Sequence, residues 1–278
     1  MSSSAADAER WLAVHIFIFC VRLLRVCSFD EDGQYQSLDE WNELQVRHSR
    51  FSVYISVSLR RGPGDNTIHY DMRVYARYFS DEARHLNFRR DTVLQFGDSW
   101  DTIGAAVLVN PGSAFPIGVP DDLTVRCLSA LTGQEDSWQQ FSPDPTMRQL
   151  AKIFNGWYAG SERPLDGCIL LYNLFNLRDK NMGEALELCH KSRSEHLFTT
   201  ETDIRQLSGQ RRIYLGWGNA GKYQLRQYAE PIFEAVRENC PYLDPVFDRN
   251  AFYHPGYVNR SYRNNPTTRL LVNDFIKN

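Results

Sequence analysis

The sequence predicts an α/β protein whose central sheet has four parallel strands flanked by helices. The first indication is a short apolar run, residues 105–109, that stops abruptly at Asn110-Pro111-Gly112-Ser113. Three later apolar runs, 167–178, 212–222 and 251–260, end in polar or glycine-containing signals in the same way, and helical spacing lies between them. Alternation of this kind is typical of a parallel sheet with right-handed crossovers.

The ends of these four strands are the expected site of chemistry. In open α/β sheets, ligands bind outside the carboxyl ends of the parallel strands. Asn110, Asn173, the Gly216-Trp217-Gly218 segment and His254 follow the four runs and would meet on one rim.

Length and composition allow one domain with an extension. The chain has 278 residues, of which 42% are hydrophobic, enough for a large core. We expect residues 1–100 to form an N-terminal helix and β-hairpin extension, and residues 101–278 to form the α/β domain. The net charge of −3 argues against broad coating of nucleic acid but leaves room for a local basic groove.

The six cysteines show no metal-ligand spacing. They indicate free buried thiols in a reducing cytosol, and no metal or cofactor is predicted.

The most apolar stretch, residues 11–27, is interrupted by His15, Arg22 and Arg25, which leaves too short a run to cross a membrane. Asp7 and Glu9 stand where a signal peptide is basic. The stretch therefore predicts a core or interface helix, in a cytoplasmic monomer without a membrane partner. After it, Ser37 and Glu40 form a capping box.

Residues 51–59 and 68–79 alternate apolar and polar side chains around the turn RRGPGDN, which predicts a β-hairpin with one buried face. Residues 80–103 look irregular, and residues 115–145 form a long segment rich in Pro, Gly and Asp. Two helix starts are clear: Asp144-Pro145, and Asn265-Pro266 before the last helix. A third helix is expected after Asn219, with a kink at Pro231.

Four motifs at these strand ends, VNPGSAF, LLYNLFNLR, LGWGNAGK and HPGYVNR, resemble in their order the signature of the uracil-DNA glycosylase superfamily. The resemblance covers residues 104–278. NPGSAF with a following GVP is most similar to the branch that has Asn in the first motif, the single-strand-selective and mismatch-specific enzymes. The chain also resembles an uncharacterised bacterial family with an NPS or NPG motif.

The resemblance implies a DNA glycosylase, a base-excision hydrolase that binds single- or double-stranded DNA, flips a base out and leaves an abasic site. It implies that Asn173 reads the base edge, that Phe141 stacks on the ring, and that His254 donates to the pyrimidine O2. Asn110 would position water, because an amide cannot remove a proton. Asp144 is the carboxylate to test for assistance, although a helix cap is its more ordinary role.

Contacts with DNA are expected beside the rim. Tyr257 and Val258 follow His-Pro where the superfamily carries its wedge. The other predicted contacts are Arg260, Arg263, Arg269, Lys222, Arg226, Trp217 and Asn219, although core packing is the more ordinary role of Trp217.

The loop after the first strand, which contains Asn110-Pro111-Gly112-Ser113, predicts which bases the site accepts. Where uracil-selective relatives place a tyrosine that excludes substituents at C5, this chain has Gly112, followed by Ser113. An open C5 side suits bulky modified bases such as hydroxymethylated or glucosylated cytosine in phage DNA, and hence antiviral defence. Two alternatives remain: repair of uracil or 5-hydroxymethyluracil, and a protein that binds nucleotide or nucleic acid without cleaving it.

Overall fold

The computed structural model describes residues 47–48, 51–52, 71–112, 114–179, 181–191, 194 and 196–278. The chain divides into two units, Met1–Asn66 and Thr67–Asn278. In the first unit, β1 (Arg47–His48) pairs antiparallel with β2 (Phe51–Ser52). The helix predicted at 11–27, the capping box at Ser37 and the strand predicted beyond residue 52 lie outside the described residues.

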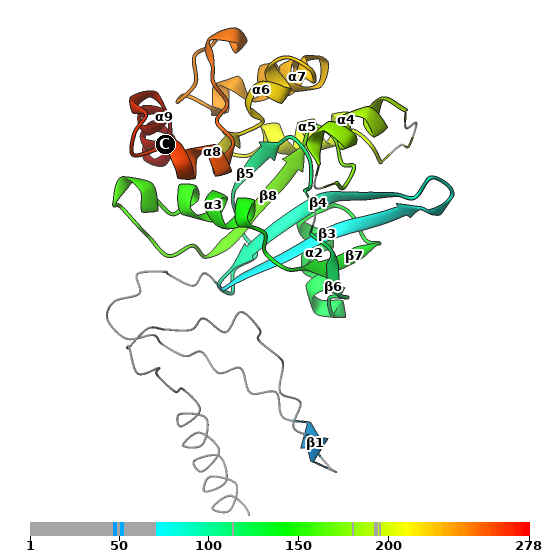
Figure 1. Cartoon of the computed structure of the whole chain (residues 1–278). Helices are drawn as coiled ribbons and strands as arrows, with labels where there is room; N and C mark the ends of the chain where they lie inside the picture. The colour runs from blue at the N-terminus through cyan, green and yellow to red at the C-terminus, as the bar shows by residue number, and fades with distance from the viewer. Residues whose placement is uncertain are drawn as a thin grey trace, which may run out of the picture. The chain divides into compact units, whose positions relative to one another are not determined.

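The second unit is built on a mixed seven-stranded sheet in the order β6-β7-β3-β4-β8-β5-β9 (Figure 1). β5 runs parallel to both β8 and β9, and the remaining pairs are antiparallel. The α/β class is confirmed at this level. The strands are β3 (Met72–Asp81), β4 (Leu86–Phe96), β5 (Thr102–Leu108), β6 (Pro116–Gly118), β7 (Trp138–Phe141), β8 (Gly167–Asn173) and β9 (Ile213–Leu215).

The fourth run expected to be a parallel strand, 251–260, does not pair in the sheet of the described residues. Residues 251–254 are irregular and Pro255 begins a helix. Phe252 has a φ of 45°, which breaks an extended strand. Its carbonyl accepts from Gly218 N at 2.7 Å, and the Tyr253 carbonyl accepts from Tyr214 Oη at 2.5 Å. A side chain of β9 thus takes one of the carbonyls that a strand partner would have used.

Helices cover both faces of the sheet. α3, α8 and α9 pack on one face, over Val74, Ile169 and Tyr214, whereas α2, α4, α5 and α7 pack on the other. The helices are α2 (Asp122–Thr132), α3 (Pro145–Phe154), α4 (Met182–Lys191), α5 (Glu201–Ser208), α6 (Gly218–Lys222), α7 (Arg226–Val236), α8 (Pro255–Ser261) and α9 (Pro266–Lys277), with short 3-10 turns at Glu82–Arg84, Trp157–Ala159, Arg237–Asn239 and Phe247–Arg249.

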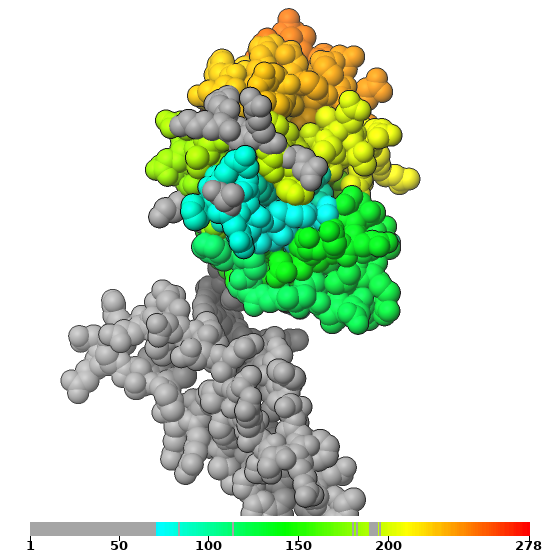
Figure 2. Space-filling view, turned by 90° about the vertical axis from the view of Figure 1, so that its right-hand side faces the viewer, coloured from blue at the N-terminus to red at the C-terminus, as the bar shows by residue number. Residues whose placement is uncertain are grey.

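β3 and β4 form an antiparallel hairpin, whereas most of the hairpin predicted from 51–59 and 68–79 lies outside the described residues. Residues 80–103, expected to be irregular, supply the end of β3, all of β4 and the start of β5. Strict alternation fails in β4 because Asp91 has a φ of 53°, which interrupts the two-residue period at a register shift. β4 also pairs with β8, so the boundary expected near residue 100 does not separate the hairpin from the α/β sheet. Figure 2 shows the hairpin, in cyan, on the surface between the green α2–β7 region and the yellow and orange region that begins with α5.

The segment 115–145 is not a long loop, because it contains β6, α2 and β7. Asp121 caps α2 by accepting from Thr124 N, a helix start that the sequence interpretation missed. The helix expected after Asn219 is broken into α6 and α7 at residues 223–225. The helix starts at Asp144-Pro145 and Asn265-Pro266 are confirmed.

The three cysteines whose side chains the structure describes, Cys127, Cys168 and Cys240, are free thiols. None of the helices described is long and apolar enough to span a membrane.

Candidate functional site

The ends of β5 and β8 bring the two predicted asparagines together. Leu108 is the register partner of Asn173 across this parallel pair. Beyond the strands, Leu174 N donates to Leu108 O at 2.9 Å and Phe175 N donates to Val109 O at 3.1 Å. Asn110 therefore follows β5 directly beside the end of β8, and its Nδ2 donates to Asp179 O at 3.1 Å.

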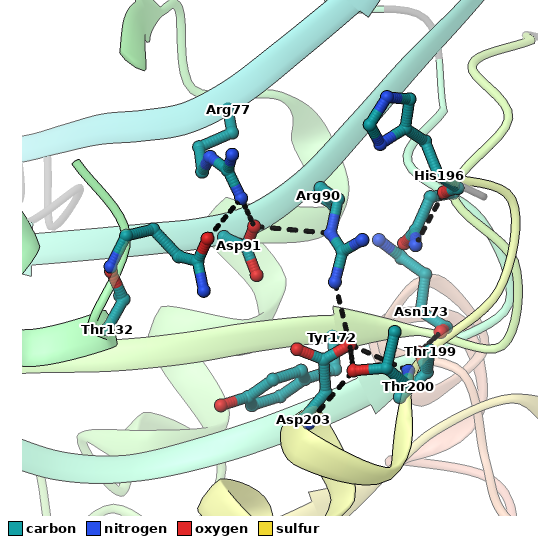
Figure 3. Close-up of polar contacts among 12 residues, drawn as sticks. Arg77, Arg90, Asp91, Thr132, Tyr172, Asn173, His196, Thr199, Thr200 and Asp203 are labelled. Carbon is teal, nitrogen blue, oxygen red and sulfur yellow. Dashed lines mark hydrogen bonds and ion pairs between the residues drawn. The ribbon is translucent and has the colours of Figure 1, made fainter. Parts of the chain in front are cut away.

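Asn173 has an amide that nothing in the described part of the chain satisfies. The residue is 1% exposed, and neither Oδ1 nor Nδ2 has a hydrogen-bond partner there. Its backbone carbonyl accepts from Thr199 Oγ1 (Figure 3). A buried amide without partners costs roughly 1–3 kcal/mol, so such groups are rare in folded proteins and call for an explanation.

The Asn-Pro-Gly turn lies next to the start of α3. Gly112 has a φ of 71°, in the left-handed region that glycine tolerates best. A Cβ at Gly112 would lie 3.9 Å from Asp144 Oδ2. Asp144 caps α3, its Oδ1 accepting from Met147 N at 2.8 Å, and its Oδ2 faces the turn. Ser113 lies outside the described residues.

Arg89 is part of this site, and the sequence interpretation missed it. The side chain is 1% exposed, and its Nη2 donates to Pro111 O. Nη2 also lies 3.9 Å from Asp144 Oδ2, and Cζ lies 5.4 Å from the centre of the Phe141 ring. Nε and Nη1 have no hydrogen-bond partner among the described residues. Burial lowers the pKa of the guanidinium to about 10, so Arg89 is charged at neutral pH.

The next residue, Arg90, differs from Arg89 because it lies close to two carboxylates, although its Nε too has no hydrogen bond among the described residues (Figure 3). Arg90 Nη2 pairs with Asp203 Oδ2 at 2.9 Å, and Nε lies 3.2 Å from Asp91 Oδ2. Arg77 Nη1 also lies 3.2 Å from Asp91 Oδ2. This cluster joins the hairpin to α5 through ordinary ion pairs. The sequence signal for Arg89 is its place in the run FRRD, and this run does not show which of its two arginines forms ion pairs.

Phe141, the last residue of β7, is buried against the same guanidinium. It pairs with Val74 of β3 and Pro116 of β6, and its ring centre lies 6.0 Å from that of Tyr78. The predicted stacking residue therefore lies beside the Asn-Pro-Gly turn, where its ring contacts Arg89 in the free protein.

His254 caps α8 and is held in one tautomer. Its Nδ1 accepts from Gly256 N at 3.1 Å, so in the neutral ring the hydrogen is on Nε2, which can donate. Burial lowers the pKa of His254; Asp144 acts against this shift and Arg260 adds to it, so the ring is neutral at pH 7. The segment that carries His254 packs closely against the ends of β5 and β9. A Cβ at Gly216, which follows β9, would lie 3.0 Å from Leu108 Cδ2 and 3.3 Å from Pro255 Cδ.

Five predicted DNA contacts are accessible; one of them, Arg269, is also engaged within the protein. Tyr257 is 39% exposed and stacks on Tyr253, with ring centres 5.2 Å apart. Arg260, Arg263 and Asn219 are exposed, and neither arginine makes an ion pair with the residues described. The other four contacts lie on α8, in the turn after it and on α6.

The other predicted DNA contacts are engaged within the protein. Val258 and Trp217 are buried in the core, so Tyr257 is the accessible one of the two wedge candidates. Lys222 Nζ donates to the carbonyls of Asp248 and Asn250. Arg226 pairs with Glu230 and Asp248, and these hydrogen bonds raise its pKa. Arg269 Nη2 donates to Arg263 O at 2.6 Å.

Comparison of the chain with protein-family models, with curated proteins and with solved structures gives no match.

Proposed function

We propose that this protein is a DNA glycosylase that flips a pyrimidine out of DNA and hydrolyses the bond between the base and its sugar. The observation that supports this most is the buried Asn173 amide, which has no partner in the described part of the chain although it lies beside the Asn-Pro-Gly turn. A carboxamide can donate and accept side by side, which matches the Watson-Crick edge of a flipped pyrimidine.

Three parallel strands, of the four expected from the superfamily that the motifs resemble, support the proposal. β8, β5 and β9 are parallel neighbours, and Tyr214 of β9 holds the segment that leads to His254. In this proposal, the residues 251–254 take the place of the fourth strand. Since Asn173 is 1% exposed, a base reaches it only after neighbouring side chains move aside.

The chemistry assigns the residues separate roles. Asn110 positions a water molecule, whose oxygen attacks C1′ while the C1′–N1 bond breaks and its electron pair leaves with the base. Neutral His254 donates from Nε2 to the pyrimidine O2, where negative charge develops; one such donor is worth about 3 kcal/mol of barrier. The proton that the water loses goes to Asp144 Oδ2, the oxygen not used for capping α3. Lys222 is the lysine of the four motifs, and its Nζ is held by the carbonyls of Asp248 and Asn250, which favours hydrolysis over Schiff-base chemistry.

The substrate that we propose is a 5-substituted pyrimidine, such as hydroxymethylated or glucosylated cytosine in invading phage DNA, because Gly112 leaves the C5 side open. The test uses single- and double-stranded oligonucleotides with one modified base each, followed by alkali to cleave abasic sites. Uracil and 5-hydroxymethyluracil belong in the panel, since excision of these alone would favour base-excision repair.

Two variants serve as controls of the assay. Asn110→Ala removes the water-positioning amide, and His254→Asn supplies a side-chain oxygen that can cap α8 in place of Nδ1 but removes the imidazole. Both should abolish strand cleavage while the protein stays folded. Unchanged cleavage by both variants would refute the mechanism. Tight, base-dependent binding without cleavage by the unmodified protein would instead favour a binding protein.

A further inference from the structure

Arg89 carries the second unsatisfied group of the site. Its charge is buried, its ion pair with Asp144 is long at 3.9 Å, and two of its three nitrogens lack a hydrogen-bond partner among the described residues. Arg90 shows that the same strand can match an arginine with carboxylates at 2.9 and 3.2 Å. An arginine that is 1% exposed cannot reach a phosphate of the DNA backbone. Its free donors are therefore available to a group that enters the site.

The guanidinium lies on the side of the site that Gly112 leaves open. Nη2 donates to the Pro111 carbonyl, one residue before Gly112. A Cβ at Gly112 would in turn lie 3.9 Å from Asp144 Oδ2, the oxygen that faces Arg89. Donors of Arg89 and an acceptor of Asp144 thus meet beside the same glycine. By the proposed function, this is where the C5 substituent of a flipped pyrimidine lies.

We infer that the site selects pyrimidines whose C5 substituent carries hydroxyl groups, and that Arg89 is the residue that distinguishes such a substituent from a methyl group. This inference rests on the proposed function. The oxygen of a hydroxyl accepts hydrogen bonds, so it can accept from the free donors of Arg89. A methyl group of similar size leaves the buried charge of Arg89 unpaired, and a site built from buried polar groups discriminates strongly against a ligand that cannot pair with them.

The size of the effect follows from the charge on the protein side. A hydrogen bond to a charged group is worth roughly 1.5–3 kcal/mol, which corresponds to about 10- to 100-fold in rate. Replacement of Arg89 should therefore lower the ratio of 5-hydroxymethylcytosine excision to uracil excision by about 10- to 100-fold. Uracil serves as the reference because it has no C5 substituent.

The experiment measures excision rates of the full-length protein on otherwise identical oligonucleotides that contain uracil, 5-methylcytosine, 5-hydroxymethylcytosine or glucosylated 5-hydroxymethylcytosine. The unmodified protein should excise the hydroxylated bases at least about 10-fold faster than 5-methylcytosine. Arg89→Met should remove this preference, and Arg89→Lys, which keeps the charge but not the planar group, should retain part of it.

Arg212→Met is the matched control. Arg212 is another arginine whose buried Nε lacks a hydrogen bond among the described residues, but it precedes β9 and donates to Phe154 O at 2.9 Å, at the opposite end of the strands. Its replacement should leave the excision ratios unchanged.

Each result has a separate meaning. If Arg89→Met lowers all excision rates by the same factor, or if 5-methylcytosine is excised as fast as 5-hydroxymethylcytosine, this inference is wrong and the glycosylase proposal stands. If Arg89→Met does not fold, the same comparison with Arg89→Lys decides. If the unmodified protein excises none of the bases, the glycosylase proposal itself is refuted.

Discussion

Replacement of Asn173 by leucine should stabilise the free protein while it abolishes base recognition. The amide is buried, and both of its polar atoms lack partners in the described part of the chain. Leucine has a similar volume, so it removes the desolvation cost of the amide without leaving a cavity. That cost is roughly 1–3 kcal/mol. If the leucine variant avoids half of this cost, its free energy of unfolding should rise by about 1 kcal/mol. For a domain of this size, the midpoint of thermal unfolding should rise by roughly 2–4 °C.

Asn176 provides the control, because it lies three residues further on and is also buried. Its Nδ2 donates to His196 O at 3.1 Å, so Asn176→Leu loses a hydrogen bond that the wild-type side chain makes. This variant should be destabilised by about 1–3 kcal/mol. The free energies of unfolding in urea, with the slopes compared, measure both effects. Equal destabilisation by the two leucine substitutions would show that Asn173 is satisfied in the folded protein, and the main support for a base-reading site would be lost.

Three further outcomes are expected. Asp144→Asn should keep the cap of α3 and lose excision activity. Asp144→Ala should lose activity and also about 1 kcal/mol of stability in urea unfolding. Full activity of the Asn variant would exclude Asp144 as a proton acceptor. Because burial lowers the pKa of His254, the stability that the neutral ring contributes is complete above about pH 6.5 and is lost as the pH falls through the folded-state pKa. The difference in unfolding free energy between the unmodified protein and His254→Asn should therefore shrink from pH 7.5 to pH 5. A constant difference would contradict this expectation. Replacement of Arg260 and Arg263 by Ala should weaken DNA binding. It should also reduce the slope of log affinity against log salt concentration by about 0.9 for each phosphate that the protein no longer binds. An unchanged slope in a salt titration would show that the two arginines lie outside the DNA interface.

Local signals in the sequence were enough for the elements whose cause is local. Asp144-Pro145 and Asn265-Pro266 begin helices because the cap and the proline act within one turn, and β5 and β8 follow from apolar runs that are buried on both faces. Asn110 and Asn173 could be placed together because parallel strands end at one edge of a sheet.

The tertiary structure alone decided the features that depend on distant partners. β3 pairs with β4, and Tyr214 holds residues 251–254. Both contacts depend on which backbone groups meet in the folded chain. The burial of Val258 and Trp217 depends likewise on the helices that cover them. Arg89 and Arg90 are adjacent and chemically identical, yet one meets two carboxylates and the other reaches the Pro111 carbonyl across the end of the sheet. Consecutive side chains of a strand point to opposite faces, and only the contacts on each face determine which of the two charges is left for a ligand.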